Sequence, residues 1–166
     1  IAERFHARLR DRLARLRVGD PLDKSTDIGT IVSAEQLDRI AGLVASGQAE
    51  GGTLHRADAP LPETGHFHAP GFFTGAEAAS RVAREEIFGP ILPVVPAETL
   101  DAALAFVNAR PRPLALYYFD DDRGRQDQVL ARTMSGGVTL NDTIFHLAQL
   151  NLPFGGVGDS GMGAYH

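Results

Sequence analysis

Apolar residues recur at helical spacing in four stretches of the chain. Ile1, Phe5, Leu9 and Leu13 follow one another every four residues, which predicts an amphipathic helix over residues 1–17. A second helix is expected over 33–47, with Leu37, Ile40, Ala41 and Val44 facing the core. A third is expected over 99–108, with Leu100, Leu104 and Val107 facing the core. The fourth is expected from Asp122 to about 133.

Ser33 begins a capping-box pattern, because Gln36 stands three residues further along the chain. The Ser33 hydroxyl is expected to accept a hydrogen bond from the Gln36 backbone amide. The Gln36 side chain is expected to reach back to the backbone of Ser33. Asp122 is expected to cap its own helix through a carboxylate oxygen.

Short apolar runs between these helices predict strands. Residues 114–119 are almost continuously apolar, as expected for a strand that is covered on both faces. Pro93 lies inside the apolar run 91–95, which should therefore lie at an edge or a bulge. Further strands are expected at 53–56, around Phe72-Phe73 and at 138–140, and the last 26 residues are expected to be loop-like.

This alternation of strands with helices of about ten residues predicts the α/β class. We expect an open, mostly parallel sheet flanked by helices, in one domain, which the length of 166 residues suits. The 43% hydrophobic and 22% charged content excludes wholesale disorder. A net charge of −5 argues against a nucleic-acid partner, and no apolar run reaches the length of a membrane span.

The chain contains no cysteine. Residues 1–166 therefore provide no disulfide, no Cys-ligated metal and no Cys nucleophile. The first residues are already in a helical pattern, and the last ones show no helix stop or tail. We therefore expect these residues to be part of a longer protein.

Residues 156–161 match the dinucleotide-binding pattern G-x-G-x-x-G letter for letter. That pattern binds a pyrophosphate only where a strand delivers the glycines to a helix N-terminus, and neither element is expected here. Residues 158–161 also resemble the G-D-S-G around the nucleophile of trypsin-like serine proteases, with His55 and Asp101 as candidate partners. That protease fold is all-β, so we favour a loop without either function.

Two polar clusters also have alternative interpretations. His66 and His68, with His55, could be metal ligands on an extended segment. No further ligand has a convincing spacing, so we favour loop histidines and predict no metal site. Residues 120–122 are three aspartates that could hold a divalent cation, but a strand-to-helix loop with a helix cap is favoured.

The six basic residues of helix 1–17 could contact a membrane or nucleic acid, and we favour a solvated arginine face.

The segment Glu85-Glu86-Ile87-Phe88-Gly89-Pro90 carries the most specific chemistry. A carboxylate beside an aromatic ring can accept hydrogen bonds from sugar hydroxyls while the ring packs on a planar heterocycle. The segment resembles the E-E-I-F-G-P motif of NAD(P)-dependent aldehyde dehydrogenases. Other segments that resemble this family, in the same order, are 18–23, 27–29, 136–138, 141–142, 152–158, 160–163 and Tyr165-His166.

The resemblance covers essentially the whole chain. The ending is similar to the class 3 branch, and residues 141–146 and 152–166 are similar to bacterial coniferyl aldehyde dehydrogenases. The resemblance implies that residues 1–166 are the C-terminal part of the catalytic domain of such an enzyme. The dinucleotide-binding domain, the catalytic cysteine and the C-terminal tail would then lie outside them.

The resemblance also implies roles for five residues. Glu86 matches the glutamate that binds the nicotinamide ribose hydroxyls, and Phe88 matches the ring that packs near the nicotinamide. Phe154 matches an aromatic residue of the aldehyde tunnel, while His146 and Phe145 lie in the matched loop at its mouth and are candidate substrate residues. No catalytic residue is expected within the chain. The glycines at 155–163 are interpreted as a closely packed backbone path.

The implied reaction is the oxidation of an aldehyde, with an aromatic one favoured, to a carboxylic acid with NAD or NADP. In the family, a cysteine thiolate attacks the aldehyde, hydride passes to the nicotinamide, and an activated water releases the acid. We expect a cytoplasmic homo-oligomer in the full-length protein, and no turnover by residues 1–166 alone. The alternative is a non-catalytic module or pseudoenzyme that retains half the fold.

Overall fold

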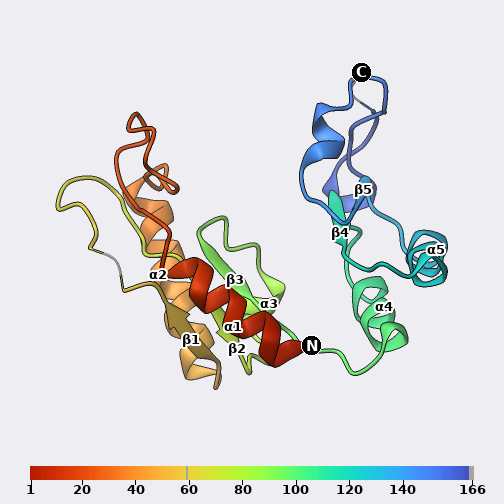
Figure 1. Cartoon of the computed structure of the whole chain (residues 1–166), viewed down its shortest axis with the longest axis horizontal. Coiled ribbons are helices and arrows are strands. Elements are labelled where there is room, and N and C mark those ends of the chain that lie inside the picture. The colour runs from red at the N-terminus through yellow and green to blue at the C-terminus, as the bar shows by residue number, and fades with distance from the viewer. Residues whose placement is uncertain (59, 165–166) are drawn as a thin grey trace. The chain divides into compact units, whose positions relative to one another are not determined.

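The computed structural model describes residues 1–58 and 60–164. The chain divides into two compact units, unit 1 over residues 1–96 and unit 2 over residues 97–166 (Figure 1). Tyr165 and His166, which belong to the family resemblance, lie outside the described residues. Within the described part of the chain, no helix has the length and apolar character needed to cross a membrane.

Unit 1 contains a three-stranded sheet in the order β1-β2-β3. The strand β1 (Thr53–Arg56) pairs antiparallel with β2 (Gly71–Thr74), and β2 pairs parallel with β3 (Ile91–Pro93). The position of β3 at the edge confirms the expectation from Pro93, because proline cannot donate a hydrogen bond to a further strand.

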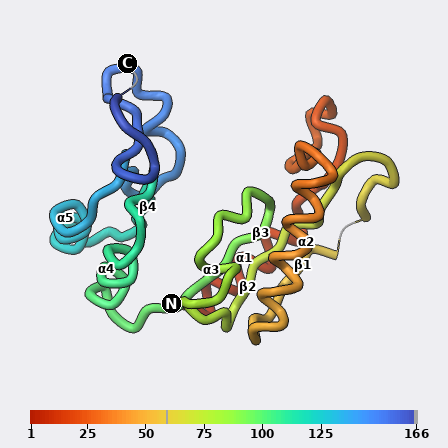
Figure 2. The backbone as a smooth tube through the Cα atoms, turned by 180° about the vertical axis from the view of Figure 1, so that it is seen from behind, coloured from red at the N-terminus to blue at the C-terminus, as the bar shows by residue number. Residues whose placement is uncertain are grey.

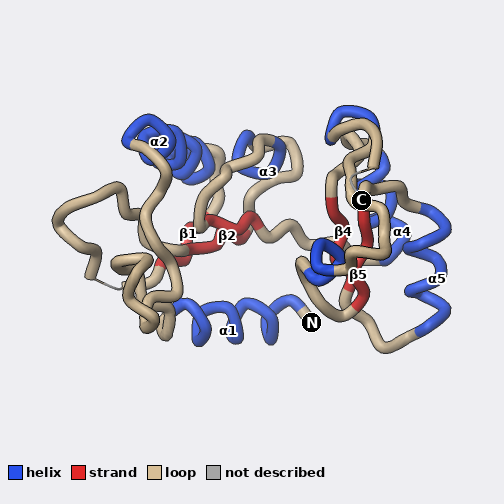
Figure 3. Tube along the Cα trace, turned by 90° about the horizontal axis from the view of Figure 1, so that it is seen from above, coloured by secondary structure: helices blue, strands red, loops and turns tan. Residues whose placement is uncertain are grey.

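Helices cover both faces of this sheet. Figure 3 shows α1 (Ala2–Leu13) on one face and α2 (Ala34–Ala49) with α3 (Arg81–Arg84) on the other. Helix α1 is shorter than expected, and the chain leaves it through turns in which Arg15 and Leu16 donate to carbonyls three residues back. The one-turn helix α3 was not predicted from the sequence.

The core of unit 1 lies between α2 and the sheet. Its buried side chains come from α2, from β2 and β3, and from the segment around α3. Ala41, which was expected to face this core, is exposed, because the buried stripe of α2 continues from Ile40 through Leu43 and Val44 to Gly47. The core cluster consists of Ile40, Leu43, Val44, Phe73, Ala76, Val82, Ile87 and Ile91.

Unit 2 contains two parallel strands and two helices. In chain order they are α4 (Leu100–Asn108), β4 (Ala115–Tyr118), α5 (Arg123–Arg132) and β5 (Gly137–Leu140). After β5 the chain continues as loops with two 3₁₀ turns, Phe145–Ala148 and Gly158–Ser160 (Figure 2, blue). The loop-like character that was expected for the last residues is therefore confirmed up to residue 164.

The predicted α/β class with mostly parallel pairing is confirmed. Two of the three strand pairs that the described residues form are parallel, and β1 with β2 is the antiparallel exception. The expectation that residues 114–119 are covered on both faces was wrong for this chain. Strand β4 has one partner strand among the described residues, and Leu114, Tyr117 and Phe119 are exposed.

Both predicted helix caps are present. The Ser33 Oγ accepts a hydrogen bond from the Gln36 backbone amide at 3.1 Å, and Asp122 Oδ1 accepts one from the Arg125 amide at 2.8 Å. Each cap satisfies a backbone donor that the first turn of a helix leaves without a partner. The two helices therefore begin where the sequence predicted.

Candidate functional site

Residues 85–90 form the loop that connects α3 to β3. Ile87, in its middle, is only 6% exposed and belongs to the core cluster of unit 1. Its neighbours Glu86 and Phe88 are exposed, and Phe88 reaches 72%. The buried isoleucine therefore anchors the loop, and the two residues expected to contact the cofactor lie at the surface on either side of it.

Two side chains of α2 hold the backbone of this loop. Gln36 Nε2 donates to the carbonyl oxygens of Ile87 at 3.0 Å and of Phe88 at 3.2 Å. Arg39 donates to the carbonyl oxygens of Glu86 at 2.8 Å and of Ile87 at 3.3 Å. The expectation that the Gln36 side chain reaches back to Ser33 was wrong, because its amide group donates to the more distant carbonyls instead.

Phe88 has a left-handed backbone conformation, with φ at +52°. A bulky side chain rarely adopts this region, and such a residue costs on the order of 1–3 kcal/mol. A hydrogen bond contributes about 0.5–1.5 kcal/mol from a neutral donor such as the Gln36 amide and about 1.5–3 kcal/mol from a charged donor such as Arg39, so these contacts together can offset the strain. Strained residues of this kind cluster at functional sites, which supports the assignment of this loop.

Gly89 lets the loop approach α2 closely. A Cβ atom at this position would lie 2.5 Å from Ile40 Cδ1 and 2.9 Å from Ile40 Cγ1. Ile40 is fully buried, so it has little room to move away. A larger residue at position 89 would therefore push the loop off the helix that holds it.

The two adjacent glutamates of the loop have different environments. Glu85 forms an ion pair with Arg81, with its carboxylate oxygens 2.8 and 3.3 Å from the guanidinium nitrogens, and this contact lowers the pKa of Glu85. The carboxylate of Glu86 makes no hydrogen bond or ion pair with any of the described residues. Glu86, rather than Glu85, is therefore available to accept hydrogen bonds from a ligand.

In unit 2, three aromatic rings gather beside β5. The His146 ring lies 5.8 Å from that of Tyr117 and 6.0 Å from that of Phe154, measured between centroids. His146 Nδ1 is 3.1 Å from Thr139 Oγ1, which fixes the ring against the strand. The structure thus brings together two of the residues expected at the substrate pocket, His146 and Phe154.

The third residue of that group, Phe145, is 62% exposed and lies outside this ring cluster. The residue before it, Ile144, has φ at +66°, which is a clear outlier for a β-branched side chain. Its side chain is 60% exposed. Sequence reasoning missed Ile144, since nothing in the letters around it signals a left-handed backbone.

Asn141 ties the beginning of this loop to the end of β4. Its side-chain oxygen accepts from the Asp120 amide at 2.8 Å, and its side-chain nitrogen donates to the Asp120 carbonyl at 3.0 Å. Asn141 also has a positive φ of +57°, which asparagine tolerates better than most residues. The loop over residues 141–151 thus starts from a position fixed by two hydrogen bonds.

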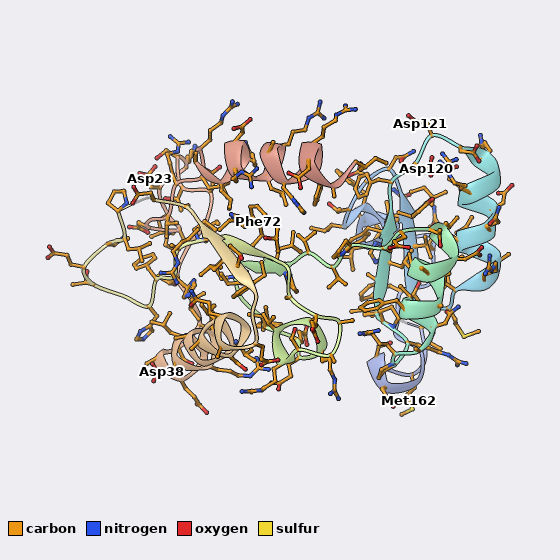
Figure 4. All side chains as sticks on the ribbon, turned by 90° about the horizontal axis from the view of Figure 1, so that it is seen from below. Asp23, Asp38, Phe72, Asp120, Asp121 and Met162 are labelled. Carbon is orange, nitrogen blue, oxygen red and sulfur yellow. The ribbon has the colours of Figure 1, made fainter. Side chains whose placement is uncertain are left out.

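The three aspartates after β4 serve the structure of the strand-to-helix loop. Asp120 (labelled in Figure 4) accepts two hydrogen bonds from the Arg125 side chain, at 2.6 and 2.7 Å, and one from the Tyr118 hydroxyl at 2.9 Å. The Arg125 guanidinium holds the pKa of Asp120 well below its usual range. Together with the Asp122 cap, these contacts confirm the structural interpretation of this cluster.

The glycine-rich segment after Phe154 is packed against backbone. A Cβ atom on Gly155 would collide with the Gly163 carbonyl, and one on Gly156 with the Ser160 carbonyl. The Ser160 hydroxyl bonds within its own turn, accepting from the Val157 amide at 2.9 Å and donating to the Val157 carbonyl at 3.1 Å. This geometry supports the interpretation as a close backbone path.

Two of the three histidines considered as metal ligands have other partners, and the third, His66, is exposed. His55 Nε2 lies 2.9 Å from Thr74 Oγ1, and its ring stacks on Phe72 with centroids 4.6 Å apart. His68 is buried with Nδ1 2.8 Å from the Ala69 carbonyl, and burial lowers the pKa of its imidazole. In the part of the chain that the structure describes, no three histidine, aspartate or glutamate residues gather as a metal site.

The fold and the loop over residues 85–90 together define a member of an oxidoreductase family. The Aldehyde dehydrogenase family model matches residues 1–166 of this chain. The chain belongs to the aldehyde dehydrogenase family, which confirms the resemblance found in the sequence.

Curated relatives agree with this assignment. A probable coniferyl aldehyde dehydrogenase of Pseudomonas aeruginosa is 47% identical over 150 residues, which cover 87% of this chain and 30% of that protein. A dimeric NADP-preferring aldehyde dehydrogenase of Rattus norvegicus is 40% identical over 149 residues, covering 89% of this chain and 31% of the relative. The chain thus spans about a third of the length of these relatives.

Solved structures show the same fold. The betaine aldehyde dehydrogenase of Staphylococcus aureus in complex with NAD+ is 30% identical to this chain, with a TM-score of 0.89. The similarity covers 98% of this chain and 33% of that structure. Both units of the chain therefore have counterparts in an enzyme of the family.

Proposed function

We propose that this chain is part of an enzyme that oxidises an aldehyde to a carboxylic acid with NAD or NADP. The observation that carries this proposal is the loop around Ile87, which presents a free carboxylate and an exposed ring on either side of that buried residue. The family membership supports the reaction class. The chain supplies groups that bind and orient, and residues 1–166 contain no cysteine that could act as the nucleophile.

Glu86 and Phe88 suit a nicotinamide nucleotide by their chemistry. The Glu86 carboxylate would accept hydrogen bonds from the nicotinamide ribose hydroxyls, and the Phe88 ring would pack near the nicotinamide. The bound nicotinamide supplies the acceptor for the hydride. The solved relative from Staphylococcus aureus holds NAD+, and the rat relative is named NADP-preferring, which supports this cofactor class without a choice between the two.

We assign Phe154, His146 and Phe145 to the aldehyde pocket. The aromatic rings of Phe154 and His146 lie 6.0 Å apart between centroids and offer the kind of surface on which an aromatic substrate packs. The relatives named coniferyl aldehyde dehydrogenase support an aromatic aldehyde. The pocket residues of this proposal all lie in unit 2.

Residues 1–166 would be part of one catalytic domain, with the nucleophile and the dinucleotide-binding domain contributed from outside them. The rat relative is called dimeric, which supports a homo-oligomer. We also expect the full-length protein to be located in the cytoplasm. The alternative of a non-catalytic module rests on the absence of cysteine from residues 1–166.

An assay of aldehyde-dependent NADH and NADPH formation tests the function. The full-length protein should oxidise aldehydes, aromatic ones faster than aliphatic ones, and residues 1–166 alone should show no turnover. In the full-length protein, Glu86→Gln should slow hydride transfer about 10- to 100-fold, the loss expected for a hydrogen bond to a charged group.

Glu85→Gln is the matched control, because that carboxylate is paired with Arg81. It should leave hydride transfer within about twofold of the wild type, since an exposed ion pair contributes little. Equal rates in the wild type and Glu86→Gln would reject the role of Glu86. A full-length protein without any aldehyde oxidation would instead favour the non-catalytic module.

A further inference from the structure

The geometry around the loop 85–90 points to two positioning residues on α2. We infer that Gln36 and Arg39 set the orientation of Glu86 and Phe88 by holding the backbone carbonyls between them. This inference rests on the proposed function of the loop. It concerns residues that act on the cofactor-binding side chains through the backbone, without a proposed contact to the cofactor.

Three consecutive carbonyl oxygens, those of residues 86, 87 and 88, accept hydrogen bonds from the same helix. In a regular strand, successive residues face opposite sides, so three carbonyls in a row cannot all meet one neighbour. The left-handed conformation of Phe88, with φ at +52°, departs from that regular geometry. Holding these carbonyls therefore also holds the unusual conformation of Phe88.

The two donors divide the loop between them. Both side chains contact the Ile87 carbonyl, but Gln36 holds the carbonyl of Phe88 and Arg39 that of Glu86. Gln36 and Arg39 are three residues apart on α2 and so lie on one face of the helix. Gln36 should therefore govern the ring of Phe88, and Arg39 the carboxylate of Glu86.

The face of α2 that carries these donors is itself well fixed. Ile40, next to Arg39, is fully buried in the core cluster and contacts the loop where Gly89 passes. The Ser33 cap fixes the first turn of the helix, from which Gln36 projects. A fixed helix with planar donors suits the role of positioning, because the guanidinium and amide groups present their N–H donors in fixed directions.

The test uses the full-length protein with changes at both donors. Gln36→Glu keeps the size of the side chain but removes its N–H donors, and Arg39→Met removes the guanidinium. Gln36→Glu and Arg39→Met should each slow single-turnover hydride transfer about 3- to 10-fold, as for the loss of one or two hydrogen bonds, because Phe88 and Glu86 are then held less firmly. Arg39→Lys, which keeps a charged donor, should recover part of the loss.

Two further readouts separate positioning from general stability. Hydrogen exchange at residues 85–90 should become faster in Gln36→Glu and in Arg39→Met, while the melting temperature stays close to that of the wild type. Asp38→Asn is the control, since Asp38 (Figure 4) is exposed on the same helix and forms no hydrogen bond with any of the three carbonyls. This control should leave rates, KM and exchange unchanged.

The outcomes distinguish this inference from the proposed function. If the wild type is active and Glu86→Gln is impaired, but Gln36→Glu and Arg39→Met behave as the wild type, the positioning role is wrong and the function stands. The inference is also overturned if the two variants lose activity together with a lower melting temperature, while hydrogen exchange at residues 85–90 stays as in the wild type. A wild type without nucleotide reduction contradicts the function, while hydrogen exchange still tests whether α2 holds the loop.

Discussion

Phe88 combines an exposed ring with a backbone conformation that bulky residues rarely adopt. Its neighbour Ile87 is buried, so the loop cannot rotate freely to relieve the strain. The ring itself contributes little burial, because 72% of the residue is exposed. The conformation of Phe88 is thus imposed by the contacts of its backbone and not by packing of its side chain.

The positive φ and the exposed ring predict an order of stabilities for variants at position 88. Phe88→Gly should change the free energy of unfolding by less than about 1 kcal/mol, because glycine adopts a positive φ without a steric cost and little burial is lost. Phe88→Val should lower it by about 1–2 kcal/mol, since a β-branched residue is poorly tolerated there. Urea unfolding of the two variants checks this order, and a glycine variant less stable than the valine variant would show that the ring holds the loop.

At the scale of elements, the junction between β4 and α5 is organised by Asp120. Its carboxylate binds Arg125 and Tyr118, and its backbone binds Asn141 and Gln126. One residue thus connects the end of a strand, the first turn of the next helix and the start of the loop after β5. Removing the charge of Asp120 should therefore affect all three of these segments.

The lowered pKa of Asp120 gives this junction a pH dependence. Because the folded pKa lies below the ordinary value of 3.8, folding favours the charged form. The stabilisation is complete above that ordinary value and is lost as the pH falls through the lower folded pKa. Asp120→Asn should therefore be less stable than the wild type near neutral pH, and the difference should shrink from about pH 5 to about pH 2.

Urea midpoints measured across this pH range, with the Tyr117 and Tyr118 signals as probes, test this prediction. Asp121→Asn serves as the control, because the Asp121 carboxylate forms no hydrogen bond or ion pair with any of the described residues. High salt should reduce the effect at neutral pH, since the Arg125 side chain is half exposed. A constant difference between wild type and Asp120→Asn at every pH would contradict the assignment.

At the scale of the whole molecule, many large apolar side chains lie at the surface of unit 2. Phe119, Phe145 and Leu150 are 61%, 62% and 75% exposed. Scattered exposed apolar residues are ordinary, whereas a contiguous patch of them marks a surface that normally meets another protein surface. In the proposed enzyme, the remainder of the catalytic domain and the partner subunit would supply that surface.

Residues 1–166 in isolation should therefore associate with one another. Sedimentation velocity should show a sedimentation coefficient that rises with protein concentration, and an apolar dye should gain fluorescence on binding. Replacing Phe119 with aspartate should reduce both signals, while the full-length protein should bind much less dye. A chain that remains monomeric and binds no dye at any concentration would contradict this expectation.

Local interactions explain why much of the fold could be predicted. The caps at Ser33 and Asp122 act over three residues, so the letters alone locate the beginnings of α2 and α5. The edge position of β3 follows from Pro93, whose ring removes a backbone donor wherever it stands. The motif around Ile87 identified the family in the same way, because it is written in consecutive residues.

The sequence by itself thus determined the α/β class, most elements and the family. Tertiary structure decided how the site is built, because the deciding contacts join residues 47 to 52 positions apart. Only the fold shows that the Glu86 carboxylate has no partner among the described residues, and that the Gln36 side chain donates to the loop carbonyls and not to Ser33. Such choices depend on which groups become neighbours in space, and no local pattern records that.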